Sequence, residues 1–105
     1  MATIRSELKT RASASDVWSA IRDTGALHTR LVPGFVTDTK LEPGARIVTF
    51  VHGTVLREPI VTLDDEARGL VWTAEGGRAR HYNAALQVSE LADGLTSVVW
   101  TAAIP

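Results

Sequence analysis

The stretch from Gly44 to Val88 constrains the fold more than any other, because it contains four successive segments that are typical of β-strands. Each segment is rich in Val, Ile, Thr or aromatic residues: Gly44–Val51, Thr54–Leu63, Gly69–Ala74 and Arg80–Glu90. Short polar or glycine-containing runs of the kind that form hairpin turns lie between them. The pattern therefore predicts four neighbouring strands of one antiparallel sheet.

Three further strands are predicted on either side of this group. Ala2–Lys9 alternates between apolar and polar residues, which indicates a half-buried strand with a solvated outer face. Phe35–Leu41 and Thr96–Ile104 are also rich in strand-forming residues and are bounded by turns. The inner face of the first strand would be formed by Ile4, Ser6 and Leu8.

Helical structure is predicted only between the first two strands. Ser13 or Ser15 can accept a hydrogen bond from a free amide at the start of a helix. Val17 and Ile21 lie four residues apart and would form the apolar stripe of that helix. A second short helix is predicted over Ala26–Leu31, before a proline and a glycine require a loop.

Length, charge and composition exclude several classes of protein. A chain of 105 residues is large enough for a single core, so residues 1–105 are predicted to form one domain. The net charge is −1 and the Lys and Arg residues are scattered, whereas a nucleic-acid-binding surface would show a basic stripe. No apolar run is long enough to span a membrane, and the first residues do not form a signal peptide. Without cysteine there is no disulfide, so a cytoplasmic location is the default expectation.

Alternation along the strands also predicts which side chains share the buried face of the sheet. They are Val48, Phe50, Leu56, Glu58, Ile60, Trp72, Ala74, Tyr82, Ala84, Leu86, Val88, Val98, Trp100 and Ala102. Most of these side chains are large and apolar, and two short helices cannot easily cover them. The face therefore needs a partner surface, a bound ligand, or both.

A set of residues in a particular order runs through most of the chain. It comprises Ser15-Asp16-Val17-Trp18, Ile21 and Asp23, then Pro33-Gly34, Gly44-Ala45-Arg46, Gly53, Arg57-Glu58, Leu63-Asp64-Asp65, Tyr82 and Trp100. This set resembles the START-like superfamily, also called Bet v 1-like or SRPBCC. More narrowly, it is similar to the bacterial polyketide cyclase/dehydrase and lipid-transport group, which is related to birch-pollen allergens and plant abscisic-acid receptors.

The resemblance implies an α+β helix-grip fold, in which a seven-stranded curved antiparallel sheet wraps around a long C-terminal helix. A hydrophobic cavity lies between them. That helix should begin shortly after Ile104-Pro105, where the sequence ends. The expectation is a helix-grip domain that lacks this helix, either because the chain is shortened or because another copy closes the sheet. An apolar face left open favours a homo-oligomer such as a dimer, or a pocket wider than is usual in the family.

Glu58 and Arg46 are the polar residues predicted to face inward. Burial would raise the pKa of Glu58 and prepare it to act as a general acid or base, which makes it the one catalytic candidate. The resemblance adds that plant receptors place a ligand-contacting glutamate at this point. A structural ion pair with Arg46 is the first expectation, because a buried arginine needs a carboxylate partner. Ligand contact comes second and catalysis third.

The remaining candidates are mostly apolar, and ordinary core packing is as good an explanation for each aromatic residue as ligand contact. The predicted ligand-binding residues are Arg46, Val48, Phe50, Leu56, Glu58, Trp72, Tyr82, Leu86 and Trp100. Asp64-Asp65 lies in a turn, where hydrogen bonds that form the turn explain both carboxylates. The three histidines lack metal-ligand spacing, and no cofactor motif occurs, so neither a metal nor a cofactor is predicted. By resemblance, His52-Gly53 would form a gate over the pocket and Gly76-Gly77-Arg78 a latch. A solvated loop histidine is the first expectation for His52, and a plain hairpin explains the paired glycines equally well.

Three functions are consistent with these residues. The first is binding of a small hydrophobic, ring-containing molecule, with polar groups oriented by Glu58, Arg46 and Tyr82. The second is an aromatase/cyclase or dehydratase that uses Glu58 as acid or base. The third is a protein-interaction domain that associates through the open sheet face.

Overall fold

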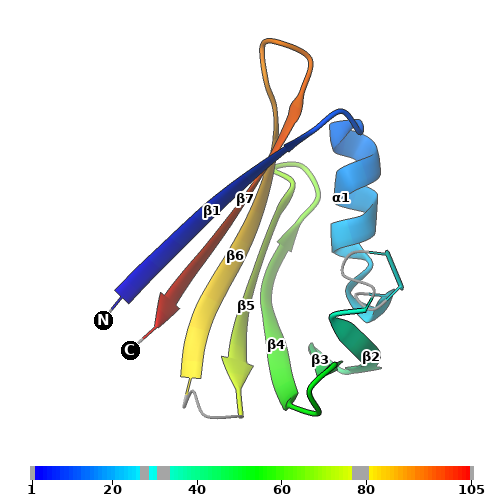
Figure 1. Cartoon of the computed structure of the whole chain (residues 1–105), viewed down its shortest axis with the longest axis vertical. Helices are drawn as coiled ribbons and strands as arrows, with labels where there is room; N and C mark the ends of the chain where they lie inside the picture. The colour runs from blue at the N-terminus through cyan, green and yellow to red at the C-terminus, as the bar shows by residue number, and fades with distance from the viewer. Residues whose placement is uncertain (1, 27–28, 31–33, 77–80, 105) are drawn as a thin grey trace.

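One seven-stranded antiparallel sheet makes up most of the molecule (Figure 1). The computed structural model describes residues 2–26, 29–30, 34–76 and 81–104. The strand order across the sheet is β1-β7-β6-β5-β4-β3-β2, so the first and second strands form the two edges. The strands are β1 (Ala2–Thr10), β2 (Val36–Glu42), β3 (Ala45–Phe50), β4 (Val55–Asp64), β5 (Gly69–Glu75), β6 (His81–Glu90) and β7 (Thr96–Ile104). All seven predicted strands are confirmed, with small shifts at their ends.

One α-helix is present among the described residues, α1 (Ala14–Arg22), and it follows the first strand. Ser13 is its N-cap, and the Ser13 side chain accepts a hydrogen bond from the Asp16 backbone amide. A 3-10 turn, η1 (Thr24–Ala26), comes next. The predicted second helix over Ala26–Leu31 lies partly outside the described residues. η1 ends at Ala26, the first residue of that prediction.

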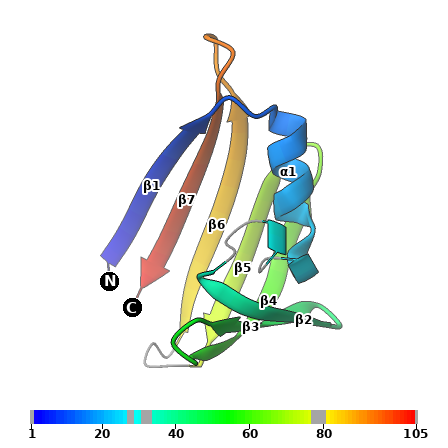
Figure 2. The same ribbon diagram turned by 45° about the vertical axis from the view of Figure 1, so that its right-hand side comes forward.

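The curvature of the sheet creates the space in which the core forms. In Figure 2, α1 lies against one face of the sheet, and β2 and β3 bend round below the end of the helix. The buried core lies between α1 and the middle strands. It consists of Ala14, Trp18, Ile21, Leu70, Trp72, Ala84, Val88 and Ala102. The predicted inner face is therefore the concave face, as the alternation indicated.

The edge strand β1 differs from its prediction. Alternation predicts that Ile4 and Leu8 lie on the buried face of a half-buried strand, but 42% and 65% of their surfaces are exposed. The reason is position, because β1 pairs with β7 along one side only and α1 covers the sheet further along, beside β6. Alternation gave the correct face of this strand, but it did not show whether any element covers that face.

A polar contact joins α1 to the turn between β4 and β5. Asp65 accepts a hydrogen bond from the Trp18 indole, Nε1 to Oδ1, at 2.8 Å. It also pairs with Arg22, whose Nε lies 2.6 Å from the same oxygen. The hydrogen bond from Arg22, followed by that from Trp18, holds the pKa of Asp65 below its usual value. Asp64 instead accepts from the backbone amides of Glu66 and Ala67, as predicted for a turn residue.

We expect Asp65→Asn to lower the thermal unfolding midpoint at neutral pH. The variant keeps an acceptor for Trp18 but loses the charge that pairs with Arg22. A lowered folded-state pKa stabilises the protein above the unfolded pKa of the aspartate, and this contribution disappears as pH falls through the folded value. The difference from wild type should therefore vanish in acid. Glu66→Gln in the same turn is the control, and an equal effect from it would contradict a specific role for Asp65.

Candidate functional site

A large cavity lies between the concave face of the sheet and α1. Its volume is about 810 Å³. Phe50, Trp72, Leu86, Val98 and Trp100 provide the sheet side of its wall. Because strand side chains alternate, these residues share one face although they come from four different strands. The wall is therefore largely aromatic and aliphatic, with few polar groups.

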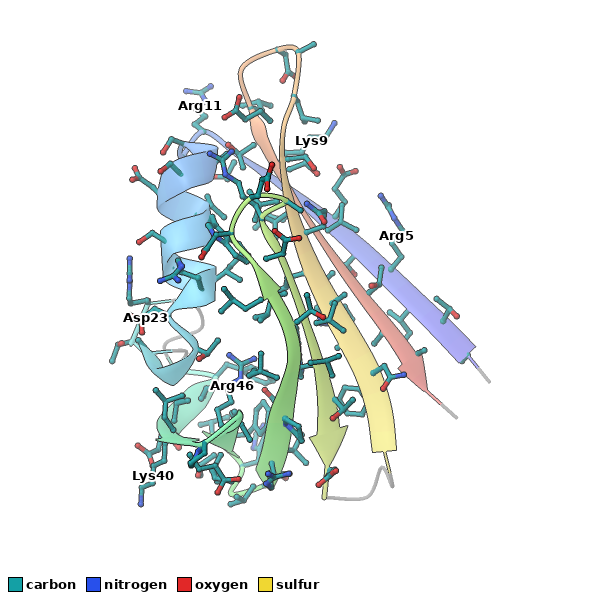
Figure 3. All side chains as sticks on the ribbon, turned by 180° about the vertical axis from the view of Figure 1, so that it is seen from behind. Arg5, Lys9, Arg11, Asp23, Lys40 and Arg46 are labelled. Carbon is teal, nitrogen blue, oxygen red and sulfur yellow. The ribbon has the colours of Figure 1, made fainter. Side chains whose placement is uncertain are left out.

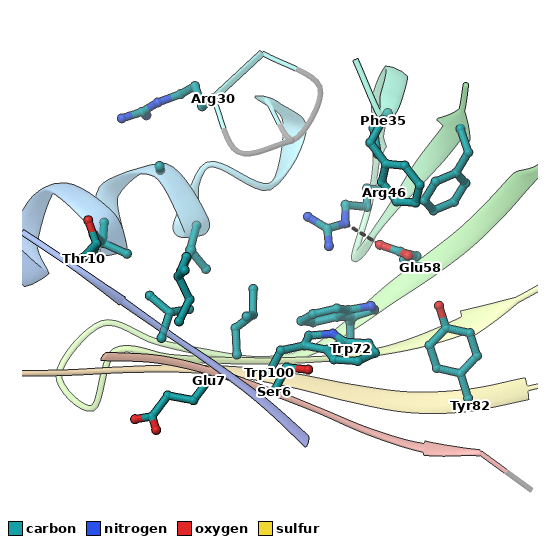
Figure 4. A pocket seen from close by; sticks show the side chains of 18 residues that line it. Ser6, Glu7, Thr10, Arg30, Phe35, Arg46, Glu58, Trp72, Tyr82 and Trp100 are labelled. Atoms are coloured by element: carbon teal, nitrogen blue, oxygen red, sulfur yellow. Dashed lines mark hydrogen bonds and ion pairs between the residues drawn. The ribbon is translucent and has the colours of Figure 1, made fainter. Parts of the chain in front are cut away.

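Two of those polar groups form a buried ion pair. Arg46 and Glu58 are directly opposite each other on β3 and β4, and Nε of Arg46 lies 2.7 Å from Oε1 of Glu58 (Figure 4). Only 4% and 5% of the two side-chain surfaces are exposed. Nη1 of Arg46 also makes a long contact of 3.5 Å with the carbonyl oxygen of Thr24 in η1. Burial of two opposite charges is tolerable here because they compensate each other.

Aromatic side chains surround the ion pair, and burial shifts the pKa values of two ionisable groups there. The guanidinium carbon of Arg46 lies 5.3 Å from the centre of the Trp72 ring, within cation–π range. Burial raises the pKa of Glu58, and the charge of Arg46 opposes that rise without cancelling it. Burial, and next the charge of Glu58, raises the pKa of Tyr82. The Trp72 indole N–H is buried and has no acceptor among the described residues.

Seven of the nine predicted ligand-binding residues line the cavity. They are Arg46, Phe50, Glu58, Trp72, Tyr82, Leu86 and Trp100. Val48 and Leu56 are buried on the same strands but do not line it. They are directly opposite each other on β3 and β4. The structure thus brings the predicted polar residues together at one end of the cavity.

Several residues that line the cavity were not among the predicted site residues. Ser6 and Leu8 come from the edge strand, Val17 and Ile21 from α1, and Phe35 from the turn immediately before β2. The Phe35 ring contacts Phe50 edge-on, with 5.4 Å between ring centres. Alternation and the helical stripe had already indicated the inward faces of β1 and α1. The sequence does not show how strongly the sheet curves. This curvature determines which residues of distant elements face each other across the cavity.

The other predicted features contribute little to this site. His52 is exposed in the turn after β3, and most of the predicted latch, from Gly77 onward, lies outside the described residues. Within the described part of the chain, no group of three acidic or histidine side chains is placed to hold a metal ion. No described helix is both long and apolar enough to cross a membrane.

Residues 1–105 match the protein family described as polyketide cyclase/dehydrase and lipid transport. The chain belongs to this family. The resemblance seen in the sequence is thereby confirmed, and so is the helix-grip type of fold. No curated protein sequence matches the chain.

Several solved structures are similar to this one in fold. A Thermobifida fusca protein is 33% identical, with a TM-score of 0.81, over 99% of this chain and 74% of that one. A Bacillus thuringiensis protein is 18% identical, with a TM-score of 0.88, over 98% and 77% of the two chains. Norcoclaurine synthase from Thalictrum flavum is 24% identical, with a TM-score of 0.75, over 96% and 67%. At these lower identities the likeness concerns the fold alone.

Proposed function

We propose that this domain binds a small hydrophobic, ring-containing molecule in the cavity between the sheet and α1. The observation that carries the proposal is a largely apolar cavity of about 810 Å³ that contains one buried Arg46–Glu58 pair. Its volume lies within the range of small-molecule sites, and such sites combine apolar walls with a few polar groups. Trp72 and Trp100 offer flat surfaces to a ring, and Leu86 adds aliphatic surface to the same wall.

Titration with the neutral fluorescent probe N-phenyl-1-naphthylamine tests this proposal. The probe should brighten on transfer to the cavity, with saturation at one molecule per chain. Leu86→Asp should abolish the increase, because it places a charge in the cavity wall. Asn83→Asp adds the same charge on the same strand, but at an exposed position outside the cavity, and is the matched control. Equal brightening with both variants would refute binding in the cavity.

Catalysis is the second candidate function. The raised pKa of Glu58 favours it, because a higher pKa makes a carboxylate a stronger general base. Norcoclaurine synthase, which shares the fold, is named as an enzyme. Glu58→Gln distinguishes the two functions when rates and affinities are corrected for the folded fraction. An acid/base enzyme should lose about 10²-fold or more in turnover, whereas a binding protein should lose only modestly in affinity.

We also propose that copies of the chain associate with one another. We propose the cytoplasm as their location, because the chain contains no cysteine and so no disulfide that would require an oxidising compartment. Exposed apolar side chains support association, because Ile4 and Leu8 lie on an edge strand that pairs on one side only. Native mass spectrometry reports the number of copies and any retained ligand together. A monomer with no retained molecule would count against association and against the interaction-domain alternative.

A further inference from the structure

We propose that the cavity selects un-ionised ring compounds that carry a hydroxyl group, and that it discriminates against the corresponding carboxylates. This inference rests on the proposed function and names the chemical class of its ligand. It follows from the charges and the free hydrogen-bonding positions of the Arg46–Glu58 pair.

Within the described part of the chain, the pair leaves the polar end of the cavity without net charge. Among the described residues that line the cavity, the other charged side chains are Arg30 and Glu7. Arg30 is paired with Asp23, 3.1 Å away, and is half-exposed. Glu7 accepts a hydrogen bond from Ser97, and Figure 4 shows its carboxylate turned away from the cavity. A carboxylate ligand would therefore lie beside Arg46, whose charge Glu58 already compensates.

The contacts within the pair leave one acceptor and several donors available. Nε of Arg46 donates a hydrogen bond to Oε1 of Glu58, and Oε2 of Glu58 has no donor among the described residues. The guanidinium carries further N–H groups at Nη1 and Nη2, of which only Nη1 has a contact in the described part of the chain. A hydroxyl group is both donor and acceptor, so it can donate to Oε2 and accept from the guanidinium. A carboxylate can only accept.

An anion bound here would be repelled by Glu58 in a medium of low dielectric constant. Among the described residues, the groups that face Glu58 are Arg46 on β3 and the Tyr82 hydroxyl on β6. Neither adds a positive charge beyond the one already paired. Binding of a carboxylate would thus require Glu58 to take up a proton. A neutral hydroxyl compound needs no such protonation.

Isothermal titration calorimetry with three ligands of one shape tests the inference: 2-naphthol, 2-methylnaphthalene and 2-naphthoate. At pH 7, 2-naphthol should bind about tenfold or more tightly than 2-methylnaphthalene, because a hydrogen bond to a buried charged group adds to affinity. 2-Naphthoate should bind more weakly than 2-naphthol. Its binding should also take up a proton, seen as a dependence of the measured heat on the ionisation enthalpy of the buffer.

The outcomes separate the inference from the proposed function. If 2-methylnaphthalene and 2-naphthol bind equally, or if 2-naphthoate binds best without proton uptake, the inference is wrong although the cavity binds rings. If none of the three binds, the proposed function itself fails. The double variant Arg46→Met/Glu58→Leu, checked for folding by circular dichroism, should keep ring binding and lose the preference for 2-naphthol. A preference that survives in this variant would overturn the role of the ion pair.

We also infer that two copies of the chain pair antiparallel through the edge strand β1, with the pairing centred on Ser6. The charged side chains of β1 are exposed, and Figure 3 shows Arg5 and Lys9 projecting from the strand away from α1. Directly opposite residues in an antiparallel pair share a face of the sheet. Centring on Ser6 places Arg5 opposite Glu7 of the other copy, and Ile4 opposite Leu8.

The neighbouring registers that keep both concave faces on the same side of the joined sheet are less favourable, because they place like charges opposite each other. A shift centred on Arg5 places two copies of Arg5 together, and a shift centred on Glu7 opposes Glu7 to itself and Arg5 to Lys9. Like charges that are directly opposite destabilise a strand pair. Because Leu8 lines the cavity, the favoured register also brings Ile4 of the second copy to the edge of the cavity.

Charge reversal with analytical ultracentrifugation tests this pairing. Arg5→Glu or Glu7→Arg alone should weaken dimerisation at least about fivefold, because each opposes like charges at two symmetric positions. The double variant Arg5→Glu/Glu7→Arg should restore the dimer. Lys9→Glu is the matched control and should have little effect, since Lys9 would face Thr3. A monomeric wild type, or a dimer indifferent to Arg5→Glu, would overturn the inference.

Discussion

Replacing Glu58 with glutamine should lower the free energy of unfolding by about 3–5 kcal/mol, the usual loss when one partner of a buried ion pair is removed. The variant leaves the Arg46 guanidinium charged and buried, with 3% of that residue exposed. For a domain of this size the loss corresponds to a fall of roughly 12 °C or more in the unfolding midpoint. Urea titration and thermal melts followed by circular dichroism measure both quantities.

Arg46→Met should behave differently with pH, because the partner left behind can become neutral. Burial raises the pKa of Glu58, and removing Arg46 also removes the charge that opposes this rise. A carboxyl group with a raised folded-state pKa stabilises the folded protein below its unfolded pKa, and the contribution disappears as pH rises through the folded value. Arg46→Met should thus be least destabilised in acid and should lose stability towards neutral pH. Glu58→Gln should show no such recovery in acid.

The double variant Arg46→Met/Glu58→Leu is the control for both single changes. Two apolar side chains of similar volume remove both buried charges, and such replacements are often neutral or stabilising. We therefore expect the double variant to be more stable than either single variant. If its loss equals the sum of the single losses, the two charges do not compensate each other, and the ion pair is not the reason for the stability of this region.

The pair illustrates what the sequence makes predictable. Arg46 and Glu58 lie on strands joined by a short turn, so alternation alone places both on the inner face and makes them neighbours. Burial of an arginine then requires a carboxylate, and Glu58 meets that need. Local alternation gave the inward positions of Trp72, Tyr82 and Trp100 in the same way.

Other contacts at the site depend on geometry that the sequence does not encode locally. The contact between Arg46 and Thr24 uses a backbone carbonyl in η1, which carries no side-chain signal. Asp65 lies in a turn, so the sequence around it predicts only a turn-forming role. Its contacts with Trp18 and Arg22 arise because the fold places that turn beside α1. The exposure of β1 depends on which strands α1 covers. Each of these features arises from the curvature of the sheet and the placement of the helix, rather than from a repeating pattern.

Trp18→Ala should be the most destabilising change in the helix, with a loss of about 3–5 kcal/mol in the free energy of unfolding. Trp18 is 5% exposed and packs in the core between α1 and the sheet. Its removal would leave a sealed void, because Ile21 and Ala14 are fixed on the same helix and cannot fill it. It would also remove the hydrogen bond to Asp65. Trp18→Phe should recover most of this loss, since it keeps the aromatic packing.

Trp100→Ala is the matched comparison, because it deletes the same side chain from the wall of the cavity. Trp100 is only partly buried and already borders open space, so its removal widens the cavity instead of creating a closed void. Its cost in urea unfolding should be clearly smaller than that of Trp18→Ala, while its loss of affinity for N-phenyl-1-naphthylamine should be larger. Equal losses of stability from the two variants would mean that the space beside Trp100 is closed and packed in solution. A ligand could then enter only if the core opened, and binding in this cavity would be refuted.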